Sequence, residues 1–266
     1  MFNLRKKRIK IIWALLFIGF VFFSSFLGAA WADEWNIKKS GHFILYYKEA
    51  PQEYISEVSR CAENYYRNIA DYLGFRRFNF WTWDKRCKIY FYPNKEEYLK
   101  ETNAVEWSRG RVHVLKKEIT TFVKDEQLLD YILPHELGHI VFREAVGFDK
   151  DLPLWLDEGV ALLQEKDRDK YLAAAKDLVK KGEYKPLEAF FRISDYNGLV
   201  PRVFYSQAAS VVEFLLEYFG RERFIIFCRN VRDGQEWEQA FKKVYNLYNL
   251  SEFERLWLTY MQIKGE

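Results

Sequence analysis

The chain has 266 residues, of which 49% are hydrophobic and 19% are aromatic, with 13 Gly and 6 Pro. This composition excludes an intrinsically disordered chain and a collagen-like or linker-type chain. The length suits one large domain or two small ones, enough to bury a hydrophobic core. The formal net charge of +3 suggests an anionic partner until the basic residues are located along the chain.

The N-terminal segment has the pattern of an export signal. Its first ten positions carry five basic residues: Arg5, Lys6, Lys7, Arg8 and Lys10. Residues 11–27 are uncharged and apolar, and they are followed by small residues that include Ala30 and Ala32. This order predicts a signal peptide or an N-terminal membrane anchor over residues 1–32. The apolar run of 17 residues is long for a signal peptide and short for a spanning helix, so cleavage after Ala32 and retention both stay open.

Both fates place the rest of the chain outside the cytoplasm, because the basic flank stays inside. We therefore expect residues 33–266 to be secreted or anchored on the extracytoplasmic side, touching the membrane only through an uncleaved N-terminal segment. Without the five N-terminal basic residues, 36 basic residues stand against 38 acidic ones. No basic stripe remains, which argues against nucleic-acid binding.

Three cysteines, Cys61, Cys87 and Cys228, are spread along the exported part. An oxidising compartment permits one disulfide bond and leaves one thiol, and the sequence does not choose among the three pairings. No two of these cysteines have the spacing of a cysteine-based zinc or redox site. The favoured interpretation is that they are small buried side chains.

Hydrophobic periodicity predicts strands first and helices later. We expect strands at 43–47, 87–92 and 111–115, the last with Val112 and Val114 on one face. A helix is expected over 51–73, with Pro51 in its first turn and Gly74 after its end, and a short one around 95–101. Helical spacing then covers 125–146, 154–166, 168–181, 205–219, 221–231, 235–246 and 250–263.

This order of elements predicts an α+β fold, in which a small mixed sheet packs on the helix over 125–146 and a mostly helical part follows. We expect residues 33–170 to hold the sheet and that helix. Residues 171–266 then form the helical part of the same structural unit.

An H-E-x-x-H motif lies in the segment 125–146, at His135, Glu136 and His139. Residues four apart lie above one another on a helix, so both imidazoles can reach one metal ion. Glu136 then lies beside the metal, where a base for an activated water must stand. Pro134 cannot donate to Asp130, so we expect the helix to kink there or to restart with Pro134 in its first turn.

Glu158 follows His139 after 18 residues and lies in a Trp-Leu-Asp-Glu-Gly-Val-Ala segment. With this spacing and context the chain resembles the gluzincin zinc peptidases, and in particular the short exported proteins of the peptidase MA-like family. The resemblance covers residues 110–220. It implies a thermolysin-like catalytic core that acts on peptide or protein substrates.

The resemblance also implies roles for individual residues. His135, His139 and Glu158 would bind Zn2+, and Glu136 would be the general base. Such peptidases use a downstream Tyr or His to stabilise the oxyanion. Tyr205, expected to open a helix, is the first candidate for this role and Tyr196 the second.

Three more residues have weaker roles under this resemblance. His113 lies on the strand that forms the edge of the cleft in this family, as a polar cleft residue rather than a ligand. Asp157 either orients a histidine or is a solvated helix residue. The G-x-M-E-N motif of the aminopeptidase N group is absent, and the surroundings of Glu106 do not match it, which favours an endopeptidase.

Two alternatives to a zinc endopeptidase remain open from the sequence. They are a non-catalytic zinc-binding module and a metallohydrolase that acts on other substrates.

Overall fold

The computed structural model describes residues 35–75, 81, 85–106, 108–246 and 249–263. The predicted signal or anchor at 1–32 lies outside these residues. Residues 37–266 form one compact unit. Across the described parts of the chain, we find no helix whose length and apolarity would let it cross a membrane.

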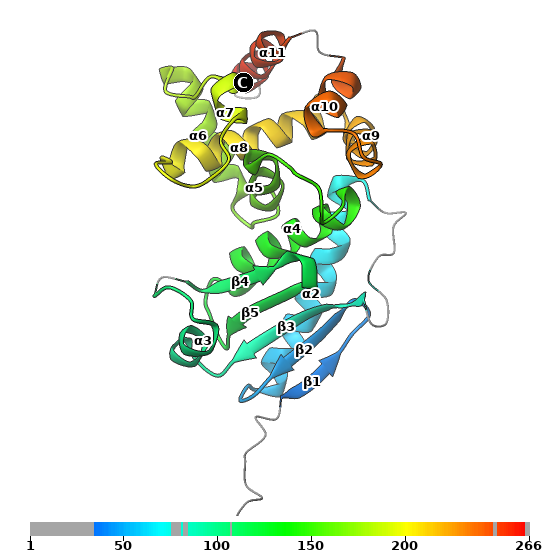
Figure 1. The fold of residues 1–266 in the computed structure, drawn as a ribbon. Helices are drawn as coiled ribbons and strands as arrows, with labels where there is room; N and C mark the ends of the chain where they lie inside the picture. The colour runs from blue at the N-terminus through cyan, green and yellow to red at the C-terminus, as the bar shows by residue number, and fades with distance from the viewer. Residues whose placement is uncertain (1–34, 76–80, 82–84, 107, 247–248, 264–266) are drawn as a thin grey trace, which may run out of the picture. The chain divides into compact units, whose positions relative to one another are not determined.

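The first half of this unit contains a mixed sheet of five strands in the order β1-β2-β3-β5-β4 (Figure 1). The strands are β1 (Asn36–Lys39), β2 (Phe43–Tyr47), β3 (Cys87–Tyr92), β4 (Gly110–His113) and β5 (Glu118–Phe122). β2, β3 and β5 run parallel, whereas β4 pairs antiparallel with β5 and forms an edge. The small mixed sheet is therefore confirmed, although β1 and β5 were not predicted.

Alternating side chains give the sheet two different faces. The buried face, with Leu45, Ile89 and Ile119, shares one core with the apolar side of α2 (Gln52–Leu73). The predicted ends of α2 are confirmed, since Pro51 precedes it and Gly74 closes it with a φ of 81°. The opposite face is partly covered by α3 (Lys95–Thr102), whose buried Tyr98 contacts rings on β3 and β5.

The hairpin between β4 and β5 differs from the predicted strand at 111–115. β4 ends at His113, and Val114–Lys116 forms a 3-10 turn that leaves Leu115 exposed. Lys117 closes this turn with a φ of 52° and donates its backbone N–H to Val114. The alternation of side chains that predicted the strand runs on into the first two residues of this turn. The predicted strand was therefore two residues too long at its C-terminal end.

The predicted helix over 125–146 is split where Pro134 lies. Leu128–Ile132 forms a π-helical turn, and α4 (Leu133–Val146) begins with Pro134 in its first turn. Pro134 has no backbone N–H to donate to the carbonyl of Asp130, and this carbonyl accepts the backbone N–H of Lys166 instead. The predicted restart is confirmed, and the proline links the start of α4 to the chain that follows Glu158.

The second half of the unit is helical, as predicted, and Figure 1 shows it beyond α4, on the side away from the sheet. Its helices are α5 (Leu154–Leu162), α6 (Arg168–Lys181), α7 (Leu187–Phe191), α8 (Pro201–Glu217), α9 (Arg221–Arg232), α10 (Trp237–Tyr245) and α11 (Leu250–Ile263). The short α7 was not predicted. α8 begins at Pro201, so Tyr205 lies one turn inside the helix rather than opening it.

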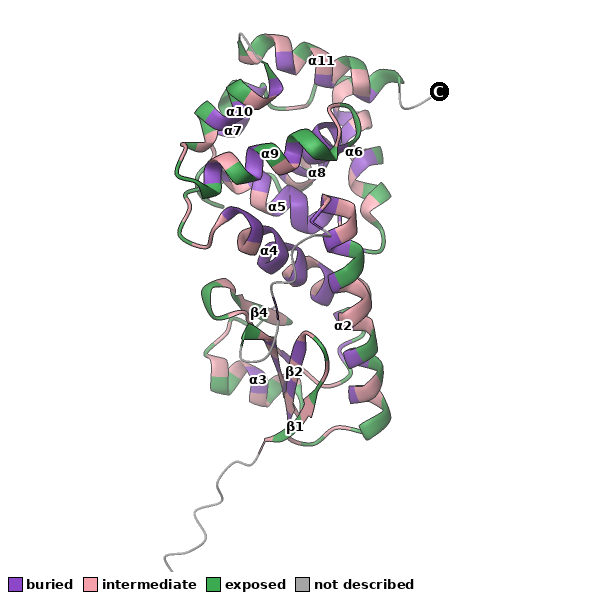
Figure 2. Cartoon of the chain, turned by 90° about the vertical axis from the view of Figure 1, so that its right-hand side faces the viewer, coloured by how far each residue is buried: buried purple, intermediate pink, exposed green. Residues whose placement is uncertain are grey.

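Glycines let α5 lie very close to its two neighbours. A Cβ atom on Gly138 of α4 would come within 2.9 Å of the Ala161 Cα on α5. A Cβ on Gly159 of α5 would come within 2.5 Å of the Ala208 carbonyl on α8. Figure 2 shows α4 and α5 as largely buried helices. The close contacts fix the relative position of the two helices that carry the predicted metal ligands.

All three cysteines fall within the described residues and are free thiols, with Cys87 and Cys228 buried and Cys61 half-buried. The interpretation as small packed side chains therefore agrees with the structure. Burial raises the pKa of both buried thiols.

Candidate active site

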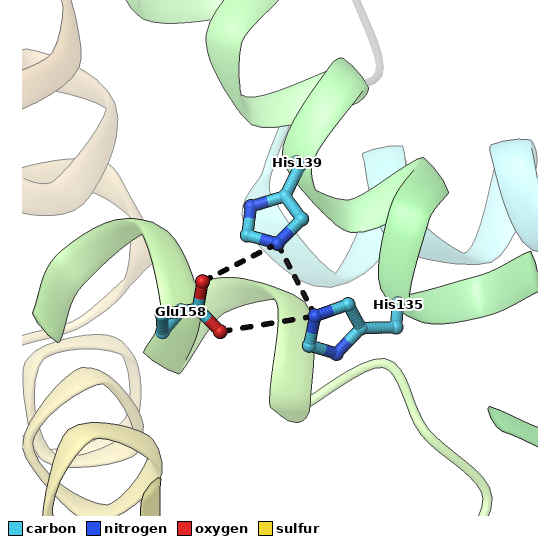
Figure 3. Close-up of side chains that lie close together, drawn as sticks. All are labelled: His135, His139 and Glu158. Carbon is cyan, nitrogen blue, oxygen red and sulfur yellow. Dashed lines mark hydrogen bonds and ion pairs between the residues drawn. The ribbon is translucent and has the colours of Figure 1, made fainter. Parts of the chain in front are cut away.

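The structure brings His135 and His139 of α4 together with Glu158 of α5 (Figure 3). The two imidazole Nε2 atoms are 3.2 Å apart, and each lies 3.8 Å from one carboxylate oxygen of Glu158. One ligand atom from each residue lies within 4.8 Å of the other two. This cluster is the one group of potential metal ligands found among the described residues.

The remaining ring nitrogen of each histidine is held by a carboxylate. His135 Nδ1 lies 3.0 Å from Glu165 Oε1, and His139 Nδ1 lies 3.3 Å from Asp157 Oδ1. Arg143 donates to the other oxygen of Asp157 at 2.8 Å. Asp157 therefore orients a histidine and is not a solvated helix residue. Two imidazoles, each held through Nδ1 and converging through Nε2 with a carboxylate, are a donor set that fits a zinc ion.

The carboxylates around this cluster give it a negative electrostatic potential. Burial by itself lowers the pKa of His139, but the charge of nearby carboxylates, chiefly Asp157, outweighs it and raises that pKa to about 9. Burial by itself raises the pKa of Asp157, but His139 and Arg143 bring it down to about 2. The charges thus favour a cation at this position, either a proton or a metal ion.

Glu136 lies on α4 between the two histidines in sequence and is half-buried. Burial is the main cause that raises the pKa of its carboxyl, and the neighbouring Glu158 adds to it. No hydrogen bond ties this carboxyl to another described residue. Glu136 and His135 line a cavity of about 240 Å³ that also reaches the start of β4 and the π-helical turn before α4. The carboxyl is thus free to accept a proton at the wall of this cavity.

The two candidate tyrosines differ in whether the hydroxyl contacts the cluster. Tyr196, in the loop between α7 and α8, donates its hydroxyl to Glu158 Oε1 at 2.5 Å and is 55% exposed. Tyr205 is half-buried and packs against the core and the ring of Phe204. Burial raises the pKa of Tyr205, and the charges of Glu158 and Glu165 add to it. Tyr205 is therefore near the cluster, but Tyr196 is the one whose hydroxyl contacts it.

The other sequence candidates lie outside the cluster. His113 is exposed at the end of β4, opposite Glu118, and Glu106 is exposed before that strand. His42, the fourth histidine, is bonded to Glu63. None of the three is a ligand of the cluster.

A family model described as Peptidase MA superfamily matches residues 83–263, which is more than half of the chain. The chain belongs to this superfamily. The match runs from just before β3 to the end of α11 and includes the whole cluster of His135, His139 and Glu158. A search of curated proteins finds no match to the chain.

Sequence reasoning missed one residue of this peptidase, Glu165. It follows Glu158 by seven residues, two helical turns, and this spacing was the available signal. α5 ends at Leu162, but turns continue the chain so that Glu165 is buried and accepts the Tyr171 hydroxyl at 2.8 Å. Glu165 thus holds His135 as Asp157 holds His139.

Proposed function

We propose that this peptidase is an extracytoplasmic, zinc-dependent metallopeptidase of the gluzincin type that acts on peptides or proteins as an endopeptidase. The observation that carries the proposal is the convergence of His135, His139 and Glu158, with the free carboxyl of Glu136 beside them. A binding module would need the three ligands but no proton acceptor.

The candidate ligands of the zinc ion are the Nε2 atoms of His135 and His139 and the carboxylate of Glu158. A zinc ion bound there would act as a Lewis acid, polarising a substrate carbonyl and lowering the pKa of a nearby water. Asp157 and Glu165 hold the two rings so that their Nε2 atoms stay directed at one point.

The proposed role of Glu136 is to move one proton in two steps. Its carboxylate takes a proton from the water that attacks the peptide carbonyl, and the carboxylic acid then gives that proton to the leaving amine nitrogen. A raised pKa makes the carboxylate a stronger base for the first step. A side chain held by another protein group could not serve in this way as readily.

A hydroxyl donor is proposed for the oxyanion that develops on the carbonyl oxygen when water adds to the carbonyl carbon. Tyr205 was favoured by sequence context. The contact of Tyr196 with Glu158 is a specific observation in favour of Tyr196. Its loop also leaves the side chain open to substrate.

Endopeptidase action rests on the absence of the G-x-M-E-N motif, whose glutamate binds a free amine in the aminopeptidase N group. Export rests on the basic and apolar pattern of residues 1–32. A non-peptide metallohydrolase remains the alternative from a different class.

The test uses purified full-length protein and its Glu136→Gln variant. We expect about one zinc per chain in both proteins, measured by elemental analysis, and cleavage of an unfolded protein substrate by the parent alone. Zinc in both proteins without hydrolysis over a broad substrate panel would favour the binding module. Zinc in neither would overturn the metal site.

A further inference from the structure

The cavity beside Glu136 is lined by one arginine, Arg109, whose guanidinium is only partly used by hydrogen bonds within the protein. Its walls come from the start of β4, from the π-helical turn and from α4, so it opens directly onto the proposed catalytic groups. A volume of about 240 Å³ suits one side chain or one chain end of a substrate rather than a folded partner. What this cavity recognises depends on the polar groups that line it.

Most of these polar groups are already bonded elsewhere. The Tyr131 hydroxyl donates to Asp167, and the Ser108 hydroxyl lies 3.2 Å from the Gly110 carbonyl. His135 uses Nδ1 for Glu165, which is also bonded by Tyr171. These groups are not available to a ligand without breaking a bond within the protein.

Arg109 is different. Its Nη1 donates to both carboxylate oxygens of Asp125, at 3.1 and 3.2 Å. Asp125 has a side chain that is 0% exposed, whereas the Arg109 side chain is 45% exposed. The backbone N–H of Gln127 also donates to Asp125, at 2.7 Å. The buried carboxylate of Asp125, which also accepts the N–H of Gln127, thus holds the guanidinium in place at the cavity wall.

The Nε and Nη2 groups of Arg109 have no acceptor among the described residues. A guanidinium offers its donors in a planar fork that matches a carboxylate. Because the group is already held by Asp125, binding a ligand costs little further side-chain entropy.

We propose that Arg109 is the specificity-determining residue of this substrate subsite and that it binds a carboxylate close to the scissile bond. The carboxylate belongs either to an Asp or Glu side chain or to the C-terminal end of a short peptide. The inference rests on the proposed peptidase function, and it adds a substrate class to it.

The test compares peptides that differ only in a carboxylate. One mixed-sequence set carries Asp and Glu, and a second carries Asn and Gln at the same positions; each is made with a free and with an amidated C-terminus. Cleavage rates of the zinc-loaded full-length protein are followed by mass spectrometry. We expect kcat/KM to be about tenfold higher for peptides that place a carboxylate at the subsite.

Replacing Arg109 alone would leave Asp125 buried without its ion-pair partner, which can unfold the protein. The variant is therefore Arg109→Gln with Asp125→Asn, which removes both charges. We expect its carboxylate preference to disappear. The matched control is Arg192→Gln with Glu188→Gln, an exposed ion pair at the end of α7, which should keep the preference.

The two C-terminal forms distinguish the sources of the carboxylate. A preference that persists in amidated peptides assigns the subsite to acidic side chains, and one that needs the free C-terminus assigns it to the chain end. No preference in the parent, or a preference that persists in the Arg109/Asp125 variant, overturns the inference while leaving the peptidase function intact.

Binding separates this inference from the proposed function. The same peptides are titrated into Glu136→Gln by fluorescence anisotropy, in the presence and absence of the Arg109/Asp125 substitutions. Binding that prefers carboxylates and depends on Arg109 supports the subsite even if no peptide is cleaved. Absence of that preference in both binding and cleavage overturns it.

Discussion

At the scale of single residues, the site is defined by what each polar atom has as a partner. Both imidazoles have one nitrogen held by a carboxylate, and Glu158 is contacted by the Tyr196 hydroxyl. Glu136 alone has a carboxyl with no described partner. A half-buried carboxyl without a protein partner costs stability, so its position beside the cluster is better explained by function than by stability.

The two tyrosines can be separated by removing one hydroxyl at a time. We expect Tyr196→Phe to lower kcat about 100-fold, because an oxyanion donor is lost, while zinc content stays the same. Tyr205→Phe, the matched control, should change kcat much less because its ring packing is kept. Steady-state kinetics and zinc analysis measure both. A large loss of kcat in Tyr205→Phe alone would return the role to Tyr205.

A second residue-scale prediction concerns Glu63, far in sequence from the cluster. Burial by itself raises the pKa of Glu63, but hydrogen bonds from His42 and Ser40 outweigh it, and the pKa is lowered overall. A carboxyl with a lowered pKa in the folded state stabilises the protein above its unfolded pKa of about 4.3. That stabilisation is lost as the pH falls from the unfolded pKa through the lower pKa of the folded state.

Glu63→Gln should therefore lower the free energy of unfolding by about 1 kcal/mol at pH 7 and by less at pH 3. Urea unfolding at the two pH values gives the difference. The exposed Glu188→Gln is the control and should show no such pH dependence. An equal loss at both pH values would assign the effect to packing rather than to charge.

At the scale of elements, the sequence predicted what local patterns determine. α6 and α11 have the predicted ends, and β3 does too, because periodicity and end signals agree there. β5 was missed because Thr120 and Thr121 break its apolar pattern. Its place inside the sheet depends on parallel pairing with β3, which is distant in sequence. The two histidines were readable because they follow helical spacing, and Glu158 because its distance from His139 matches the family pattern. Glu165 lies beyond the end of α5, outside both patterns.

The contact of α5 with α8 yields an element-scale prediction. In Gly159→Ala the new Cβ would lie 2.5 Å from the Ala208 carbonyl and 2.6 Å from Val212 Cγ2, so α5 must move. We expect a loss of about 1–3 kcal/mol in stability, and weaker zinc binding because Glu158 moves with the helix. Chemical denaturation and a chelator competition measure the two effects. The control is Ala173→Ser on the exposed side of α6. Unchanged zinc affinity would show that α5 adapts without moving Glu158.

At the scale of the whole unit, the cluster joins two parts of the chain. α4 packs on α2 beside the sheet, and α5 packs on α8 within the helical part. Ligands from α4 and α5 therefore make one bound ion a link between the sheet and the helical part. Anything that binds the folded chain but not the unfolded one stabilises it by mass action.

This link predicts how the melting temperature depends on metal. Zinc at about 100 times its Kd should stabilise the fold by about 2.7 kcal/mol, which corresponds to a rise in Tm of about 5–10 °C for a chain of this size. Differential scanning calorimetry with zinc and with a chelator measures it. Glu136→Gln keeps all three ligands and should keep the rise, whereas His139→Gln should lose it. Equal melting temperatures in zinc and in chelator, or a rise that persists in His139→Gln, would contradict a metal site that joins α4 to α5.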